Sequence, residues 1–335
     1  MKILLVVPSR EAPSAKWRLL QFVPHFQKAG HAVTVEELPS GLMARLSQAM
    51  RGASHDVVVL QKRLLPKLLV NRYRANAKVF VFEFDDVPTL KKNEEGAVRE
   101  SPTKDRRFRR VVRVADAVIT SNETLAAEAR KVAASPDQVH VFPTAIDLAR
   151  WSVRPEPGAE VVIGWMGTPG NLPSMEILRA PLLRLCRRYE KVKVRIVCEE
   201  ALPLEGVRAE HRLFRTEEEV SDIRGFDIAV APLVEDAWTR GKLSTKVLAY
   251  FAAGLPVVAS DVQANRLYIR DGENGFLVGT LAQWEAKLGA LIEDAALRKS
   301  VGAKARETVE KEFSLDAMVP RYLRLFEQLL AKPKA

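Results

Sequence analysis

Short apolar runs alternate with segments of helical periodicity along most of this 335-residue chain. The runs at residues 2–7, 56–60 and 78–82 have the length and composition of buried strands. A second series of the same kind begins at residue 161, after a proline-containing stretch at 155–158. Strands that alternate with helices at this spacing form parallel, doubly wound sheets. The sequence therefore predicts an α/β fold with two Rossmann-like domains.

Ligands of such sheets bind beyond the carboxyl ends of the strands, so the segments that follow predicted strands are candidate site loops. In the first domain these segments are residues 9–18, 61–63 and 85–90. Residues 17–28 are predicted to form one helix, residues 91–103 a loop, and residues 105–115 a basic helix.

The stretch at 235–277 concentrates the candidate chemistry of the second domain. A polar segment leads into a predicted helix that ends at Gly254, and Pro256 follows two residues later. A helix N-terminus attracts anions, and this one is surrounded by cations, small residues and hydroxyls. These residues are Arg240, Gly241, Lys242, Ser244, Thr245 and Lys246. The pattern indicates either a diphosphate site or a solvated basic helix start.

The same stretch resembles the donor-side signature of the group 1 glycosyltransferases. The matching positions are Trp238, Arg240, Gly241, Lys242, Lys246, Leu248, Tyr250, Gly254 and residues 256–260. The resemblance implies the GT-B fold, in which two Rossmann-like domains face each other across a cleft. It also implies a hexosyltransferase that uses a nucleoside-diphosphate sugar, retains the anomeric configuration, and needs neither a metal nor a cofactor.

The resemblance also implies a division of labour along the chain. Residues 1–153 would form the acceptor-side domain, and residues 154–314 would form the nucleotide-sugar domain. The last helix, within residues 315–335, would pack back on the first domain.

Donor-binding roles are implied for several residues of the second domain. Gly167 and Thr168 would approach the diphosphate, while Arg240 and Lys242 would act in catalysis by stabilising its charge as it departs. Contacts to the base, the sugar and the ribose are expected from Phe214, Glu217, Glu235 and Trp238. Each position also has a purely structural alternative. Gly167 and Thr168 could form a tight turn, and Phe214 and Glu217 could belong to an ordinary loop. Glu235 could balance the charge of Arg240, and Trp238 could simply pack in the domain.

One departure from the family pattern lies at Ala249, where many members carry a glutamate that binds donor hydroxyls. A second acid of the pattern would fall on Gly241. Alanine cannot hydrogen-bond a hydroxyl. The departure opens the alternative of a non-catalytic nucleotide-sugar-binding protein on the same scaffold. An epimerase on a similar scaffold, which would use no acceptor, is a further alternative.

In the first domain, Asp85 and Asp86 follow a predicted apolar strand. Both are expected to bind acceptor hydroxyls, and Asp86 is also expected to stabilise positive charge on the sugar ring. The alternative is that one of them caps a helix and the other is a solvated acid. Arg18 either neutralises an acceptor phosphate or lies exposed on an amphipathic helix. Glu83 and Asp85 loosely match the Asp-x-Asp metal motif of the other glycosyltransferase fold, but the second-domain signature argues against a metal site.

The distribution of charge along the sequence narrows the classes of partner that the protein could bind. Residues 1–150 hold 25 Lys and Arg against 16 Asp and Glu, whereas the remainder holds 27 against 26. The basic half predicts an anionic partner, either a surface glycan or lipid-linked acceptor or an anionic membrane beside residues 105–115. A solvated helix face is the alternative. No nucleic-acid-reading motif occurs, which argues against a nucleic-acid partner.

The cysteine content favours a cytoplasmic protein, and the basic first half adds the expectation of a peripheral location at the inner membrane face. Cys186 and Cys198 are the two cysteines, and their spacing does not suggest a metal site. No run of eighteen apolar residues occurs in the sequence.

Overall fold

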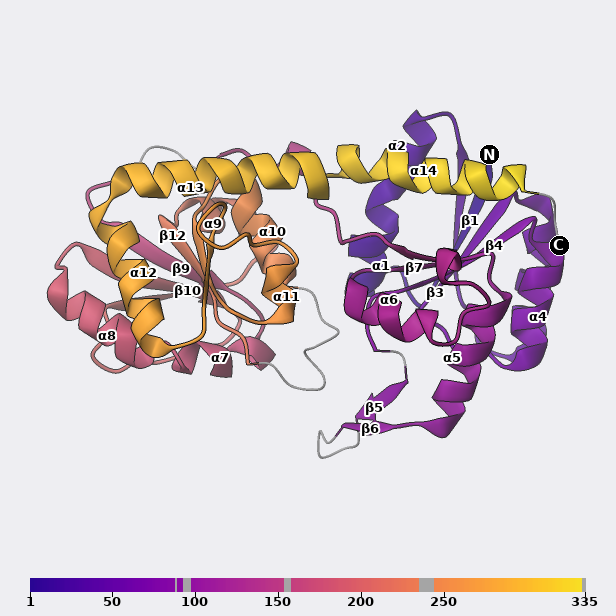
Figure 1. The fold of residues 1–335 in the computed structure, drawn as a ribbon, viewed down its shortest axis with the longest axis horizontal. Coiled ribbons are helices and arrows are strands. Elements are labelled where there is room, and N and C mark those ends of the chain that lie inside the picture. The colour runs from indigo at the N-terminus through magenta and orange to yellow at the C-terminus, as the bar shows by residue number, and fades with distance from the viewer. Residues whose placement is uncertain (88, 93–97, 154–157, 235–243, 333–335) are drawn as a thin grey trace. The chain divides into compact units, whose positions relative to one another are not determined.

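The computed structural model describes residues 1–335 except 88, 93–97, 154–157, 235–243 and 333–335. The chain forms two compact units (Figure 1). One contains residues Met1–Ala145 together with the C-terminal helix, and the other contains the described residues between Ile146 and Ser314. The division at Ala145 lies slightly before the residue 153 expected from the sequence. Each unit is built on one six-stranded sheet.

The sheet of the first unit is parallel throughout, in the order β2-β1-β3-β4-β7-β8. Its strands are β1 (Lys2–Val7), β2 (Ala32–Glu37), β3 (Val57–Gln61), β4 (Val79–Phe84), β7 (Ala117–Thr120) and β8 (Val139–Val141). The three central strands β1, β3 and β4 are buried almost throughout, because helices cover both faces of the sheet. The strand order reverses between β1 and β3, which is where ligands of such sheets bind.

Two layers of helices enclose this sheet. One face carries α3 (Leu42–Arg51), α4 (Lys67–Asn76), α5 (Pro102–Val114) and α6 (Glu123–Arg130). The other face carries α1 (Pro13–Arg18), α2 (Val23–Lys28) and α14 (Leu315–Ala331). The last helix returns to this face from the far end of the sequence, and its Tyr322 ring lies 4.9 Å from Phe22 and 4.7 Å from Phe142 between centroids (Figure 1).

Two local predictions for the first unit are wrong. The helix expected over residues 17–28 is divided into α1 and α2 by a 3₁₀ turn at Leu20–Phe22. Pro24 explains the break, because proline fits the first turn of a new helix but not the middle of a continuous one. The loop expected over residues 91–103 contains a short antiparallel hairpin, β5 (Leu90–Lys92) and β6 (Val98–Glu100), and its last residues begin α5.

The second unit repeats the same architecture. Its parallel sheet has the order β11-β10-β9-β12-β13-β14. Its strands are β9 (Val161–Met166), β10 (Val192–Cys198), β11 (Ala209–Leu213), β12 (Ile228–Ala231), β13 (Val257–Ser260) and β14 (Phe276–Val278). Its helices are α7 (Pro173–Glu176), α8 (Arg179–Arg188), α9 (Glu219–Arg224), α10 (Thr245–Ala252), α11 (Gln263–Arg266), α12 (Leu281–Glu293) and α13 (Ala295–Thr308). A π-helical turn, Val309–Phe313, follows α13.

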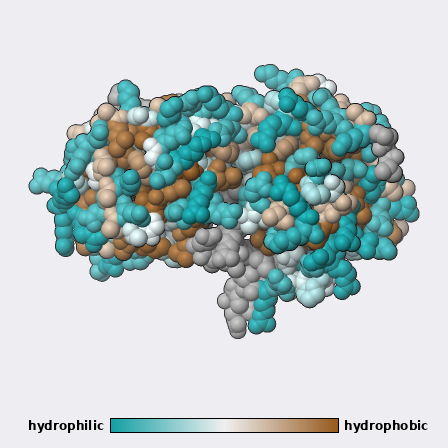
Figure 2. All heavy atoms as spheres, viewed as in Figure 1, coloured by the Kyte–Doolittle hydropathy of each residue, from teal (hydrophilic) through white to brown (hydrophobic). Residues whose placement is uncertain are grey.

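The two cores account for most of the large apolar side chains in the described part of the chain. The face shown in Figure 2 is accordingly mainly hydrophilic, with smaller hydrophobic areas between. None of the described helices combines the length and apolar character needed to cross a membrane.

Candidate functional site

The carboxyl edge of the second sheet brings the end of β9 against the start of α10. The Lys246 ammonium, in the first turn of α10, lies 4.4 Å from the centroid of the Trp165 ring in β9. Gly167 follows β9 directly. A Cβ added at Gly167 would lie 2.5 Å from the Trp165 ring and 3.1 Å from Lys246 Nζ. Two residues predicted from separate motifs, Gly167 and Lys246, are therefore neighbours, and only glycine fits this approach.

The same contact is fixed from the side of the helix. Tyr250, one turn beyond Lys246, is buried, and its hydroxyl accepts a hydrogen bond of 2.9 Å from the amide of Met166. The Gly167 amide donates to the carbonyl of Val197 in the neighbouring strand β10, at 3.1 Å. These bonds hold the end of β9 and the first turn of α10 in one arrangement. Tyr250 was recognised only as a family position, and its structural task was not predicted.

Burial changes the chemistry of the Lys246 side chain. Desolvation lowers the pKa of its ammonium to about 7, with a small opposing effect of the Cys198 thiol. The Trp165 ring compensates part of the lost hydration through a cation–π contact. An anion beside Lys246 would restore its charged form, so this site is electrostatically prepared for one.

The N-terminus of α10 adds backbone donors to this ammonium. Ser244 is the residue before the helix, and its hydroxyl does not cap it; Thr245 is the first helical residue. Helix N-termini that lack a cap leave N–H groups for an anion. Ser244, Thr245, Lys246 and Gly167 thus gather at one edge of the second sheet.

The other predicted donor residues are placed less closely. Thr168 is exposed, and its hydroxyl accepts from the Asn171 amide at 3.0 Å. Phe214 and Glu217 follow β11, the edge strand on the same side, and Glu217 is exposed. Among the described residues, no hydrogen bond or cation–π contact joins Phe214 or Glu217 to Gly167 or Lys246. The remaining predictions lie outside the described residues: Glu235, Trp238, Arg240, Gly241 and Lys242.

A buried asparagine that the sequence did not point to supports the segment leading into this region. Asn265, in α11, donates to the carbonyls of Ser260 (2.8 Å) and Ala231 (3.4 Å), which end β13 and β12. The Ser260 hydroxyl in turn accepts from the amide of Leu233 at 2.9 Å. These hydrogen bonds therefore fix the course of the chain directly after β12, between that strand and residue 235.

At the carboxyl edge of the first sheet, a lysine joins the two predicted carboxylates. Lys62, directly after β3, has its ammonium 2.9 Å from Asp85 and 2.7 Å from Asp86. Burial opposes its charge, but attraction to the two carboxylates outweighs burial and raises the pKa of Lys62. Lys62 has a φ of 56°, a left-handed conformation that lysine seldom adopts. The loop 61–63 was a candidate from the sequence, whereas this ion triad was not predicted.

One expectation for Arg18 is wrong, because its side chain is not exposed on an amphipathic helix. It is 2% exposed in its side chain, and its Nε donates to Glu83 at 2.8 Å. A second nitrogen, Nη1, donates to the carbonyl of Phe142 at 2.8 Å. Gln61 donates to the other oxygen of Glu83 at 2.9 Å. Arg18 therefore ties α1 to β4 and to the segment after β8, and Glu83 is the carboxylate paired with it.

The described residues contain no group of three His, Cys, Asp or Glu side chains arranged to hold a metal ion. In particular, Glu83 and Asp85, which loosely match a metal motif, bind Arg18 and Lys62 respectively.

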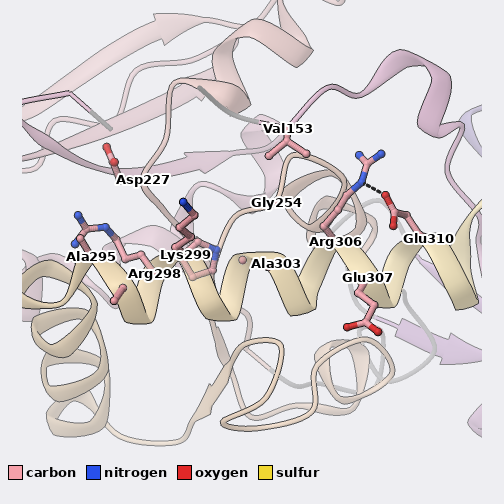
Figure 3. A pocket seen from close by; sticks show the side chains of 13 residues that line it. Val153, Asp227, Gly254, Ala295, Arg298, Lys299, Ala303, Arg306, Glu307 and Glu310 are labelled. Atoms are coloured by element: carbon pink, nitrogen blue, oxygen red, sulfur yellow. Dashed lines mark hydrogen bonds and ion pairs between the residues drawn. The ribbon is translucent and has the colours of Figure 1, made fainter. Parts of the chain in front are cut away.

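A separate cavity of about 540 Å³ lies in the second unit. It is lined by residues of α13 and by Asp227 (Figure 3). Pro256 also lines it, and because Asp227 and Pro256 precede β12 and β13, the cavity lies at the amino edge of the sheet, whereas Lys246 lies at the carboxyl edge. Its Arg306 is paired with Glu310 at 2.6 Å (Figure 3). The candidate site is therefore the opposite edge, where the predicted residues meet.

Comparison with known proteins gives one family match, which lies in the second unit, and several related glycosyltransferases. Residues 161–294 match the family model described as glycosyl transferases group 1. A lipopolysaccharide core biosynthesis glycosyltransferase, LpsE of Rhizobium meliloti, is 31% identical over 114 residues, which are 33% of this chain and 32% of that protein. An uncharacterised glycosyltransferase of Methanocaldococcus jannaschii is 30% identical over 99 residues, 29% of this chain and 25% of that protein. The matched segment thus spans a third or less of these relatives.

Solved structures resemble the whole chain. A glycosyltransferase from Rickettsia africae superposes with a TM-score of 0.75 at 15% identity, covering 99% of both chains. The HepE protein of Anabaena, solved in complex with UDP and glucose, gives a TM-score of 0.66 at 14% identity, covering 98% of this chain and 100% of that one. At these identities the comparison establishes the fold, which is the GT-B fold predicted from the sequence.

Proposed function

We propose that this protein transfers a sugar from a nucleoside-diphosphate sugar to an acceptor hydroxyl. The chain belongs to the group 1 glycosyltransferase family, whose model matches residues 161–294. The observation that carries the proposal is the meeting of Gly167 with Lys246 at the N-terminus of α10. At Gly167 a ligand can approach the backbone closely, and Lys246 and the N–H groups at the start of α10 provide positive charge and hydrogen-bond donors. Together these features are suited to binding a diphosphate. HepE, which shares the fold, was solved with UDP.

In the proposed reaction, the second unit holds the donor and stabilises its leaving group. The bond between the anomeric carbon and the diphosphate oxygen breaks, and the acceptor oxygen forms the new bond on the same face, with retention of configuration. The acceptor hydroxyl loses its proton to the departing diphosphate oxygen. Lys246, together with Arg240 and Lys242 from the segment outside the described residues, would stabilise the negative charge of the departing diphosphate. Cations can do this without a metal, so the reaction is proposed to be metal-independent.

The acceptor is proposed to bind at the carboxyl edge of the first sheet. Asp85 and Asp86 are the carboxylates available there for acceptor hydroxyls, and Lys62 holds both in fixed positions. A surface glycan or a lipid-linked sugar suits the basic character of the first 150 residues. A peripheral contact with an anionic membrane belongs to the same proposal.

A matched pair of lysine variants tests the donor site. Lys246→Met should weaken the binding of the donor nucleotide about ten- to a hundred-fold, the usual worth of a charge-assisted hydrogen bond. Lys287→Met is the control, because Lys287 also lies over an aromatic ring, Phe276 at 4.8 Å, on another helix of the same unit. Isothermal calorimetry measures both. Equal affinities for the two variants would remove Lys246 from the donor site.

The metal and stereochemical proposals have direct tests. Activity should persist in excess chelator, and NMR of the product should show the anomeric configuration of the donor. Loss of activity in chelator, restored by Mg²⁺, would contradict the metal-free reaction, and an inverted product would contradict retention.

A second function, binding of a nucleotide sugar without turnover, is favoured by Ala249. This residue is buried in α10 and offers no hydrogen-bonding side chain where many family members carry a glutamate. Calorimetric binding of a nucleotide sugar, with no release of free nucleotide in the presence of any acceptor preparation, would select this function over transfer.

A further inference from the structure

Three neighbouring helices of the first unit, α3, α4 and α5, form a strongly cationic layer. Helix α4 packs against α3 on one side and α5 on the other. Together they contain a single acidic residue, Asp105. Their cations are Arg45, Arg51, Lys67, Arg72, Arg74, Lys104, Arg106, Arg107, Arg109, Arg110 and Arg113. The next helix, α6, carries Glu123 and Glu128, so the excess ends there.

Few of these charges are neutralised within the described part of the chain. Ion pairs join Arg51 to Glu36, Arg74 to Asp116, and Arg109 to Asp105. Arg107 and Arg113 donate to the backbone carbonyls of Leu64 and Val132, which leaves their charge uncompensated. Lys67, Arg72 and Arg106 are exposed and have no ion pair among the described residues. The layer therefore presents an uncompensated positive field.

Large aliphatic side chains project from the same helices. Leu42, Met43 and Met50 on α3 are 54%, 77% and 60% exposed, and Leu68 on α4 is 52% exposed. Met43 and Met50 line a hollow of about 610 Å³ together with Arg72 of α4. Exposed apolar side chains set among cations mark a surface that is covered by a partner.

Three of these four apolar side chains lie toward the carboxyl edge of the sheet, whereas Met50 lies near the end of α3. Leu42 and Met43 begin α3, and Leu68 is in the first turn of α4. Helices that connect parallel strands run antiparallel to them, so helix starts lie at the carboxyl edge of the sheet. Asp85 and Asp86 follow β4 at that same edge.

We propose that the α3–α4–α5 layer docks the protein on an anionic lipid bilayer. The cations lie among the headgroups, and Leu42, Met43, Met50 and Leu68 enter the boundary with the acyl chains. The contact brings the carboxylate edge of the first sheet toward the membrane. This rests on the proposed function only for the assumption that the acceptor is lipid-linked.

A bilayer suits this surface better than a nucleic acid does. Single-stranded nucleic acids are bound by cations together with aromatic rings on which bases stack. On these helices the rings of Tyr73 and Phe108 are buried in the core, and the exposed apolar side chains are aliphatic. Aliphatic side chains insert among acyl chains but provide no stacking platform.

Sedimentation of the full chain with vesicles tests the proposal. The protein should bind vesicles of phosphatidylcholine mixed with phosphatidylglycerol, should not bind phosphatidylcholine alone, and should dissociate as the salt concentration rises. Lys67→Gln, Arg72→Gln and Arg106→Gln should each weaken binding about five-fold. Arg187→Gln is the matched control, an exposed arginine on α8 of the second unit, and should have no effect.

The apolar contribution is tested separately. Met43→Asp combined with Met50→Asp should abolish vesicle binding even at low salt, whereas Leu281→Asp, at an exposed leucine that begins α12, should not. Near-ultraviolet circular dichroism and the melting temperature establish that each variant is folded. Vesicle binding that survives the double change, or equals that of the wild type in all three glutamine variants, would overturn the proposal.

Two further results would also overturn it. The first is that the protein does not bind anionic vesicles. The second is that RNA competes with the vesicles for the protein and that the same glutamine substitutions abolish RNA binding. Nucleotide binding by the second unit is measured independently of vesicles. A protein that binds a nucleotide sugar but no vesicle therefore refutes the docking surface alone, and the reverse result refutes the donor site alone.

Discussion

At the scale of single residues, the proposed donor site depends on Lys246. Its half-buried side chain places the ammonium over the Trp165 ring, beside Gly167. A bound anion would lower the free energy cost of keeping the Lys246 ammonium charged in this environment, which favours the binding of a diphosphate. This mechanism makes affinity for the donor depend on pH.

Donor binding should be accompanied by proton uptake above neutral pH. The pKa of Lys246 is about 7 in the folded chain with an empty site, well below its ordinary value of 10.5, so the amine is neutral above pH 7. Diphosphate favours the ammonium, and therefore affinity should fall as the pH rises above about 7. Calorimetry in two buffers of different ionisation enthalpy measures the uptake. It should persist in Lys287→Met and vanish in Lys246→Met; uptake unchanged in Lys246→Met would contradict the assignment.

The same shift has a consequence for stability. Between pH 7 and 10.5 an unfolded chain holds a proton on Lys246 that the folded chain lacks. Stability of the empty protein therefore gains a contribution as the pH rises through this window, and loses it below.

Gly167 should tolerate no side chain. An added Cβ would lie 2.5 Å from the Trp165 ring, and overpacking of this kind costs about 1–3 kcal/mol. Gly167→Ala should therefore displace Trp165 or Lys246 and weaken nucleotide binding about ten-fold. Gly170→Ala is the control, because nothing lies within 4 Å of its added Cβ. Similar nucleotide affinities for the two variants would show that the close approach is not needed.

Arg18 should prove structural. Removing one partner of a buried ion pair leaves the other charge without compensation, so Arg18→Met should destabilise the first unit by about 3–5 kcal/mol. Adding Glu83→Gln should restore much of the loss. Arg130→Met, which breaks an exposed pair with Glu123, should cost no more than about 1 kcal/mol. Differential scanning calorimetry measures all three, and a loss for Arg18→Met as small as the control would contradict the role.

At the scale of elements, the start and end of α10 have different requirements. Its start must remain open to a ligand, and its end at Gly254 packs against α13. Gly254 has a φ of 72°, which favours glycine. A Cβ on Gly302 of α13 would lie 2.2 Å from the Gly254 carbonyl oxygen. The position of α10 therefore depends on a glycine–glycine contact with α13.

Two helical glycines allow a direct test of that contact. Gly302→Ala should lower the melting temperature of the second unit, because the added methyl group meets backbone, at a cost of about 1–3 kcal/mol. Gly289→Ala in α12, whose nearest neighbours lie at 3.8–3.9 Å, should be neutral or stabilise by up to about 1 kcal/mol through helix propensity. A Gly302→Ala protein as stable as Gly289→Ala would show that α13 can move away from α10.

Elements were predictable where their patterns are local. The β1, β3 and β4 strands are largely continuous apolar runs, and α10 ends at Ala252, two residues before the expected Gly254. The division into α1 and α2 was missed because the apolar spacing continues across Pro24. The hairpin β5–β6 was missed because its three-residue strands are polar and carry no alternation.

At the scale of the whole molecule, the fold follows from alternation along the sequence, but the site depends on distant pairings. Arg18 and Glu83 are 65 residues apart, and Lys62 reaches Asp86 across 24. Composition and spacing contain no record of such pairs, so the pairing of Arg18 with Glu83 and that of Lys62 with the two carboxylates were not predicted. Gly167 and Lys246 were predicted because each belongs to a motif with its own chemical meaning.

The central claim is that the second unit binds a nucleoside-diphosphate sugar through Lys246 and Gly167. The measurement that tests it most directly is the melting temperature of the intact chain with UDP, GDP, dTDP and their sugars. A ligand at about one hundred times its dissociation constant stabilises by about 2.7 kcal/mol, a shift of about 5–10 °C. The account predicts such a shift with the nucleotides of one base, lost in Lys246→Met and kept in Lys287→Met. No shift with any of them would contradict it.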